Sequence, residues 1–268
     1  MILFGKHLQS FFKYMPLLFL LTAKDFKLKY RRSVLGIFWS MLNPLLLMIV
    51  FTSVFTILLR SQPVGMPFAV FYVTGALVFN LFNEATTNAM TSVISNALLI
   101  QKVYIPKYVF PIEKCAFSFV NTIFSIFAVF LVLLYYFFKG EVHFHMTVFL
   151  VFLPILFVFL FSVGVSLILS AFAVFFRDII HIWGVLTTIL FYLTPLIYPI
   201  GILENYGIGT VVKLNPLYYF VDDFRKLLVL GQMPSLAHFM INLTVCFFTI
   251  GLGLFIFKKT QDKFALYL

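Results

Sequence analysis

The sequence predicts an all-α membrane protein, with six transmembrane helices in a single transmembrane domain that covers residues 1–268. Of the 268 residues, 63% are hydrophobic and 10% are charged, whereas soluble domains carry about 25% charged residues. Six segments are long and apolar enough to cross a hydrocarbon layer about 30 Å thick. Lipid requires each segment to satisfy its backbone hydrogen bonds internally, as a helix does. The composition therefore excludes a water-soluble globule.

The six expected spans are separated by charged or proline-containing stretches. They are Leu35–Leu59, Phe68–Ser95, Pro111–Phe138, Met146–Phe175, Ile182–Ile200 and Ala237–Phe257. The first span is too long for a cleavable signal and lacks a small-residue cleavage site. An even number of spans puts both termini on one side, and 14 of the 19 Lys and Arg fall on that side. The positive-inside rule then predicts cytoplasmic termini, so the net charge of +10 needs no nucleic-acid partner.

Residues 1–34 precede the first span and are expected to form a cytoplasmic interfacial helix. Phe19, Ala23, Phe26 and Tyr30 recur at helical spacing and share one face, while most of the charges lie elsewhere. This helix either anchors the chain at the membrane surface or docks a cytoplasmic partner. The residues assigned to it are Lys24, Phe26, Lys27, Tyr30 and Arg31. Residues 258–268 are expected to form a cytoplasmic tail.

The second span carries a polar stripe. Its residues share one side of an otherwise apolar helix and are Asn80, Glu84, Thr87, Asn88, Thr91, Ser92 and Ser95. An ionised carboxylate at the centre of a membrane helix costs about 2.5–3.5 kcal/mol, so this face should avoid lipid. The stripe therefore either lines a hydrated pathway or a gate near its inner mouth, or forms hydrogen bonds between helices without a transport role.

The connection between the second and third spans, Ala97–Lys114, is apolar and basic. Pro106 and Pro111 are expected to interrupt it, which predicts a short helix flanked by turns. Because a passive loop could be shorter, we expect the connection to dock a cytoplasmic protein. Binding of anionic membrane lipid is the alternative.

The outer stretch from residue 201 to 235 is too charged for a seventh span and too apolar for an ordinary loop. Asn215 and Pro216 predict the start of a helix of about 15 residues, and Gly231 predicts its stop. We expect re-entrant helices here, which either cap the bundle or gate an exit. The gate residues would be Asn215, Pro216, Tyr218, Tyr219 and Phe224.

The sequence gives little support for an enzyme. It contains no phosphate-binding G-x-x-x-x-G-K-[ST] loop, so it cannot be its own P-loop ATPase. Asp222 and Asp223 are its only adjacent acids, and both cysteines fall in apolar runs. Glu141, His143 and His145 are not expected to bind a metal, because no further ligands cluster with them. We therefore expect no catalytic residue, metal site or cofactor in this chain.

Several runs, in order, cover nearly the whole sequence and resemble one family. They are AKDFKLKYRRSVLGIFWSMLNPLLLMIVF (Ala23–Phe51), IQKVYIPKYVFP (Ile100–Pro111), FFRDIIHI (Phe175–Ile182), LTPLIYP (Leu193–Pro199) and NPLYYFVDDFRKLL (Asn215–Leu228). The chain resembles the membrane (permease) subunits of bacterial polysaccharide ABC exporters, which handle teichoic acids, O-antigens and capsules.

The resemblance implies a permease subunit in the bacterial cytoplasmic membrane, paired with a second copy of itself. Two separate P-loop ATPase subunits would bind ATP and Mg, and a lipid-linked glycan such as teichoic acid would pass along the dimer interface. The resemblance assigns ATPase contact to the interfacial helix and to two cytoplasmic connections, with residues Lys102, Val103, Tyr104, Ile105, Pro106, Lys107, Arg177 and Asp178.

Aromatic and polar side chains suit a glycan pathway, because sugar rings stack on aromatic faces and sugar hydroxyls need polar partners. The expected pathway residues are Phe38, Trp39, Phe79, Phe82, Glu84, Asn88 and Tyr192. Three alternatives stay open: an ABC exporter of drugs or small lipids, a membrane glycosyl- or phosphotransferase that uses Asp222 and Asp223, and a passive scramblase.

Overall fold

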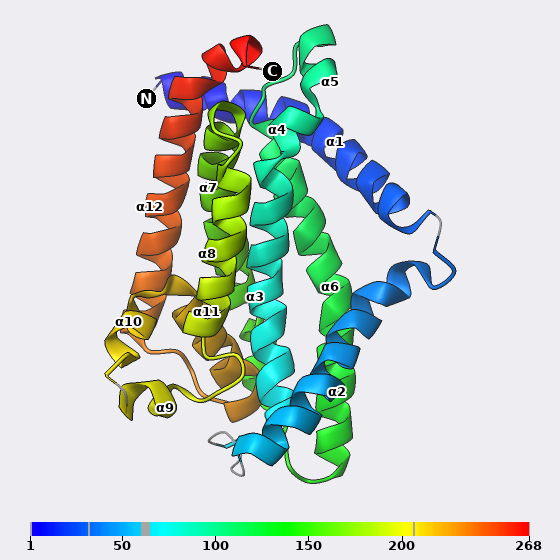
Figure 1. Cartoon of the computed structure of the whole chain (residues 1–268), viewed down its shortest axis with the longest axis vertical. Coiled ribbons are helices and arrows are strands. Elements are labelled where there is room, and N and C mark those ends of the chain that lie inside the picture. The colour runs from blue at the N-terminus through cyan, green and yellow to red at the C-terminus, as the bar shows by residue number, and fades with distance from the viewer. Residues whose placement is uncertain (1, 32, 60–64, 206, 268) are drawn as a thin grey trace.

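The computed structural model describes residues 2–31, 33–59, 65–205 and 207–267, and this part of the chain is helical without strands (Figure 1). The longer helices are α1 (Ile2–Tyr30), α2 (Trp39–Leu59), α3 (Phe68–Met90), α6 (Val109–Phe138), α7 (Phe152–Phe175), α8 (Ile179–Leu193), α11 (Pro216–Arg225) and α12 (Leu236–Thr260). The shorter ones are α4 (Ser92–Ser95), α5 (Ala97–Lys102), α9 (Ile200–Asn205) and α10 (Gly209–Leu214).

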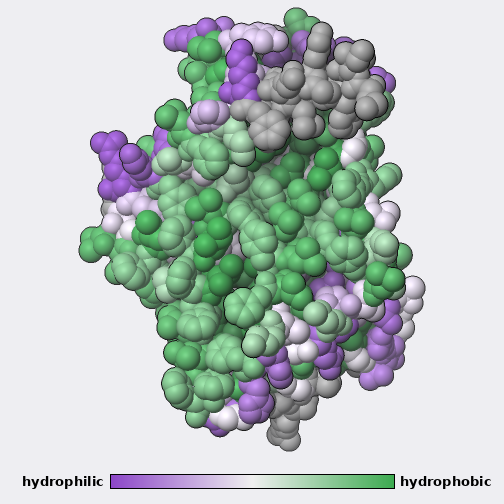
Figure 2. Space-filling view, turned by 180° about the vertical axis from the view of Figure 1, so that it is seen from behind, coloured by the Kyte–Doolittle hydropathy of each residue, from purple (hydrophilic) through white to green (hydrophobic). Residues whose placement is uncertain are grey.

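Five stretches of the described chain are long and apolar enough to cross a membrane. They are Gly36–Phe55, Phe68–Met90, Val109–Phe138, Met146–Phe175 and Leu236–Phe264. Figure 1 shows α1 lying across one end of this bundle, with both ends of the chain nearby. On the face in Figure 2, hydrophobic residues cover the middle of the molecule and hydrophilic ones gather towards its ends. This distribution is typical of a protein that spans a membrane.

The fifth expected span is shorter than predicted. The helix α8 has 15 residues and ends at Leu193, whereas the sequence predicted a span up to Ile200. Pro195 and Pro199 explain the early end, because proline lacks a backbone N–H and disfavours a helical residue before it. At 1.5 Å per residue, α8 covers about 22 Å of a hydrocarbon layer about 30 Å thick.

The second expected span also ends early. The helix α3 stops at Met90, and α4 begins at Ser92 after a break at Thr91. The Ser92 hydroxyl donates to the backbone oxygen of Ala89 at 2.6 Å, a local bond that competes with helix continuation. The short helix predicted after this span is present as α5. Pro111, however, does not interrupt the chain, because it lies in the first turn of α6, where proline is tolerated.

The helix α3 is the centre of the bundle and packs against α2, α6, α7, α8 and α11. Phe82 shows how its apolar side chains fill the core: its ring lies 5.3 Å from that of Phe161 in α7 and 6.0 Å from that of Trp183 in α8. The helix α2, by contrast, is the least buried of the five candidate spans. The core therefore forms around α3, with α2 along one side.

The helices α7 and α12 approach each other at two glycines. A Cβ atom on Gly164 would fall 2.5 Å from the backbone of Thr249, and one on Gly253 would fall 2.5 Å from the backbone oxygen of Gly164. Small residues at such a contact let two membrane helices approach closely. This contact positions α12, and through it the C-terminal turn Gln261–Leu266, which packs at the end of the bundle where α1 lies.

Candidate transport and docking site

The surface of α3 that its neighbours leave uncovered is entirely polar. Of the 23 residues in α3, 18 are buried. The five that are not buried are Asn80, Asn83, Glu84, Thr87 and Asn88. Four residues of the predicted stripe, Asn80, Glu84, Thr87 and Asn88, thus lie on the open side of the most buried span. The rest of the prediction is not met in α3, because Thr91, Ser92 and Ser95 lie beyond its end and Ser92 is buried.

Other helices expose apolar side chains, as expected for contact with lipid. Val50 of α2, Phe127 of α6 and Phe255 of α12 are each more than half exposed. Polar side chains facing hydrocarbon would lose their hydrogen bonds with water. The uncovered face of α3 is therefore suited to water or to another protein surface, and not to lipid.

Glu84 joins α3 to two other helices. Its Oε1 pairs with Lys29 Nζ of α1 at 2.8 Å, and its Oε2 accepts a hydrogen bond from Asn121 Nδ2 of α6 at 2.9 Å. The sequence left two roles open for this carboxylate, a pathway wall and a bond between helices. The structure shows the bonds between helices, while a quarter of the side chain stays exposed.

The same contact extends to α2. Tyr30 and Ser40 both donate to Asn121 Oδ1, at 3.0 and 2.7 Å, and the Tyr30 and Ser40 hydroxyls also contact each other. Ser125 Oγ donates to the backbone oxygen of Ser40 at 2.9 Å. We call Lys29, Tyr30, Ser40, Glu84 and Asn121 the four-helix polar network, since it connects α1, α2, α3 and α6.

The apolar face predicted for α1 is only partly covered by the bundle. Phe26 and Tyr30 do pack, since the Phe26 ring lies 5.1 Å from that of Phe117 in α6. Phe19 and Ala23, at the same helical spacing, are exposed and do not pack on the bundle. Leu21 is buried instead, and Asp25 pairs with Lys114 of α6. The surface of the bundle under α1 is therefore polar as well as apolar.

The two connections that carry the residues expected to dock an ATPase, after α5 and between α7 and α8, lie at the end of the bundle where α1 is found (Figure 1). Lys102, Val103 and Tyr104 are exposed, with Tyr104 93% exposed, while Ile105 and Pro106 are half-buried. Arg177 and Asp178, in the turn between α7 and α8, are also exposed. Of the cations assigned to the interfacial helix, Lys24 and Lys27 of α1 and Arg31 directly after it are all exposed.

Lys107 differs from the other docking residues, because its ammonium group is bound within the chain. Lys107 Nζ donates to the backbone oxygen of Gln261 at 2.6 Å and lies 5.6 Å from the centre of the Phe264 ring. The connection after α5 is thereby held against the C-terminal turn. We interpret Lys107 as a structural residue that holds the neighbouring exposed residues in place.

The seven predicted pathway residues occupy two environments. Phe79 and Phe82 are buried in the core of a single chain, which leaves them no surface for a substrate. Phe38, Trp39 and Tyr192 are exposed on η1 (Gly36–Phe38), α2 and α8. Glu84 and Asn88 belong to the partly exposed α3 stripe. The structure therefore does not bring the seven side chains to one surface within one chain.

The outer helix begins and ends where the sequence predicts. Asn215 caps α11 by accepting from the Leu217 N–H at 3.1 Å, and its Nδ2 donates to Thr194 Oγ1 at 2.9 Å. The helix continues as a π-helical turn, Lys226–Leu230, and ends at Gly231 with φ +67°. Of the predicted gate residues, Tyr218 and Tyr219 are half-buried and Phe224 is buried.

Arg225 is a functional candidate that sequence reasoning missed, since it counted this residue among the outer loop cations. Its guanidinium is buried and donates to the backbone oxygens of Phe71 at 2.7 Å and Pro195 at 2.8 Å. It also lies 3.6 Å from the centre of the Phe71 ring. Gly75 makes room for it, because a Cβ there would lie 2.4 Å from Arg225 Nη2. Arg225 thus fastens α11 to α3 and to the turn after α8.

A second polar contact fastens α11 to α12. Asp223 is buried, and its carboxylate contacts His238 Nδ1 at 3.0 Å and accepts from Asn242 Nδ2 at 2.7 Å. Burial raises the pKa of Asp223, although the contact with His238 opposes that shift. Asp222, Asp223 and His238 lie close enough to share a metal ion. Lys226 already pairs with Asp222 at 2.7 Å, so we interpret the group as a helix contact.

Comparison with known proteins decides the family of this chain. The ABC-2 type transporter family matches residues 16–229, which is most of the chain. The chain belongs to the ABC-2 type transporter family. The match runs from α1 to the end of the outer helix and so includes the α3 stripe, the α5 connection and Arg225.

The relatives of this ABC-2 family member have similar lengths. An O-antigen export system permease protein RfbA of Klebsiella pneumoniae is 28% identical over 251 residues, which is 93% of each chain. A protein of the same name from Myxococcus xanthus is 26% identical over 259 residues, or 96% of this chain and 97% of the relative. With its five apolar spans, this ABC-2 family chain is a multi-pass protein of the bacterial inner membrane.

Proposed function

We propose that the chain is the permease subunit of an ABC transporter that exports a lipid-linked polysaccharide across the cytoplasmic membrane. The observation that carries the proposal is the uncovered face of α3, which is polar at all five of its unburied positions. Sugar hydroxyls can exchange hydrogen bonds along such a face without binding tightly. The relatives named as O-antigen export permeases support a glycan as the substrate; teichoic acid is a chemically related candidate.

A second copy of the chain and two P-loop ATPase subunits would complete the transporter. Two α3 stripes facing each other across a homodimer would form a polar pathway that neither chain has alone. The ATPases would bind ATP and Mg and would dock on the exposed residues of the α5 connection, the α7–α8 turn and α1. Both termini would then be cytoplasmic, and α9–α11 would form the outer, re-entrant gate.

The transferase alternative has less support from the geometry. Asp222 and Asp223 would have to bind a metal or activate a substrate, yet Lys226, His238 and Asn242 already hold them in place. We therefore expect that the purified chain forms no transferase product. Asp222→Asn should accordingly change no measurable product formation.

The test is export by the purified permease, reconstituted in vesicles with the P-loop ATPase that copurifies with it. We expect an undecaprenyl-linked glycan to reach the far side only when ATP is present. Transport by the chain alone without nucleotide would contradict the proposal and indicate a scramblase. ATP-driven transport of a drug panel in place of the glycan would indicate the small-molecule exporter.

A further inference from the structure

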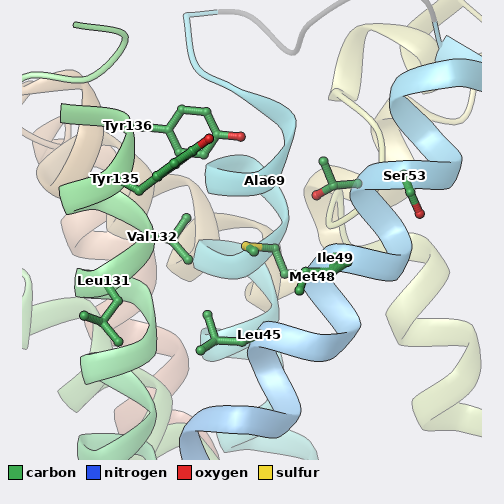
Figure 3. A pocket seen from close by; sticks show the side chains of 10 residues that line it. Leu45, Met48, Ile49, Ser53, Ala69, Leu131, Val132, Tyr135 and Tyr136 are labelled. Carbon is green, nitrogen blue, oxygen red and sulfur yellow. The ribbon is translucent and has the colours of Figure 1, made fainter. Parts of the chain in front are cut away.

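A groove of about 430 Å³ lies between α2, α3 and α6, at the end of the bundle opposite to α1 (Figure 3). Its walls are mostly aliphatic, with two tyrosines on α6. The lining residues are Leu45, Met48, Ile49, Thr52, Ser53, Ala69, Leu131, Val132, Tyr135 and Tyr136. The groove is wide enough for a hydrocarbon chain and lies among helices that expose apolar side chains.

The two ends of α2 hold the groove open. At one end, Ser40 belongs to the four-helix polar network. At the other, the Phe51 ring stacks on Tyr72 of α3 at 4.6 Å, and the Phe55 ring stacks on Phe68 at 5.8 Å. Between these attachments α2 faces α6 across the groove. The space is therefore a consequence of how α2 is fastened.

Polar groups mark one part of the groove. Thr52 Oγ1 is buried and has no hydrogen-bond partner in the described chain. Figure 3 shows the Tyr135 and Tyr136 side chains close together on α6. Lys139 follows them at the end of α6, with Nζ 4.9 Å from the Tyr135 ring centre and 5.9 Å from that of Tyr136. Among described residues, no carboxylate oxygen lies within 4.0 Å of Lys139 Nζ.

We propose that this groove binds one anionic phospholipid, with an acyl chain between α2 and α6 and the phosphate against Lys139. Tyrosine at the membrane interface with a cation beside it suits the boundary between acyl chain and headgroup. The polar stripe of α3 is elsewhere, because Ala69 precedes Asn80 by about 16 Å along the helix. We therefore infer that the groove binds a lipid of the surrounding membrane and not the lipid-linked glycan that is transported.

The experiment titrates the purified full chain in detergent with fluorescent phosphatidylglycerol and with phosphatidylcholine of the same chain length. We expect phosphatidylglycerol to bind about fivefold more tightly than phosphatidylcholine. This ratio corresponds to the attraction of about 1 kcal/mol between one lysine and an anionic lipid. Lys139→Gln should remove this preference, whereas Lys213→Gln, another outer lysine that pairs with Glu204, should keep it. Leu131→Trp should weaken the binding of both lipids, because the larger side chain would fill the groove.

The control for Leu131→Trp is Leu254→Trp on α12, where the leucine is 47% exposed against 48% for Leu131. Equal binding of the two lipids by the unaltered chain would overturn the proposal. So would a preference that survives Lys139→Gln, or equal loss in both tryptophan variants. Displacement of phosphatidylglycerol by undecaprenyl phosphate at lower concentration would also overturn it, because the groove would then belong to a polyprenyl lipid. None of these results depends on ATP or export, so they test the groove separately from the transport function.

Discussion

Arg225 and Gly75 form a pair in which each residue explains the other. The guanidinium reaches two backbone oxygens on separate segments only because α3 has no side chain at Gly75. Lysine could not replace this arginine, since a single ammonium group lacks the planar, forked set of donors. The pair makes the position of the outer helix depend on one turn of α3.

Gly75→Ala should loosen this attachment. The new methyl group would meet Arg225 Nη2 at 2.4 Å and Leu196 at 2.9 Å, and overpacking of this kind costs about 1–3 kcal/mol. Gly251→Ala is the matched control, because a Cβ at Gly251 meets nothing within 4 Å. We expect a lower melting temperature in detergent for the first variant only; equal melting temperatures would show that Arg225 moves aside freely.

Arg225→Gln should be more damaging than a change of the neighbouring cation. It would leave the Pro195 oxygen without this donor, at about 1–3 kcal/mol for a group left unpaired. The Phe71 oxygen would lose one of its donors but keep the Thr74 hydroxyl at 3.1 Å. Lys226→Gln removes only the partly exposed pair with Asp222, worth below about 1 kcal/mol. Thermal inactivation followed by size-exclusion chromatography separates the two, and similar half-lives would argue against a role for Arg225 in holding α11.

Single residues were the hardest features to predict from the sequence. The polar stripe of α3 can be predicted from the sequence, because the spacing of its residues matches one face of a helix. The burial of Arg225 cannot, because a cation in an outer segment is ordinarily solvated and its partners are backbone oxygens, which leave no pattern. Phe79 and Phe82 were assigned to the pathway because an aromatic ring can stack on a sugar. The same ring can equally pack in a hydrophobic core, and the sequence does not distinguish the two.

At the scale of elements, α1 is attached to the bundle by charge and hydrogen bonds as well as by aromatic packing. Lys29→Met should remove its ion pair with Glu84, and we expect faster backbone hydrogen exchange between residues 22 and 31. Lys27→Met, which alters an exposed lysine of the same helix, should leave exchange unchanged. Equal exchange in both variants would show that the Lys29–Glu84 pair does not hold α1 and that its other contacts are sufficient.

The connection after α5 offers a test of coupling. Replacing residues 102–106 with a Gly/Ser linker removes the exposed Lys102, Val103 and Tyr104 but keeps Lys107 on Gln261. We expect the copurifying ATPase to hydrolyse ATP without export of glycan. The same linker in place of residues 141–145, at the opposite end of the bundle, is the control and should leave the two activities coupled. Normal export with the first linker would contradict a docking role.

Elements were predicted well where composition alone decides them, and less well where proline or a local hydrogen bond does. The apolar runs located the helices from α2 to α12, and Asn215, Pro216 and Gly231 gave the outer helix its bounds. The early end of α8 depends on Pro195, and the break after Met90 depends on a serine hydroxyl. Both are local effects that an average over 20 residues conceals.

For the whole molecule, the α3 stripe should matter for transport more than for assembly. The double change Asn80→Leu and Thr87→Leu makes two exposed positions apolar without touching the core. We expect normal membrane insertion and ATPase binding but at least a tenfold loss of glycan export. Asn80→Ser with Thr87→Ser keeps the polarity and should export normally; equal export by both pairs would remove the stripe from the pathway.

The central place of α3 also bears on how the protein is made. This helix has the lowest mean hydropathy of the five candidate spans and the largest buried share. Its partners α6, α7 and α11 leave the ribosome after it, so at first only α2 can cover it and its polar stripe would face lipid. We therefore expect α3 to remain at the insertion machinery until α7 has been synthesised, and the nascent chain to enter the bilayer as a group of helices.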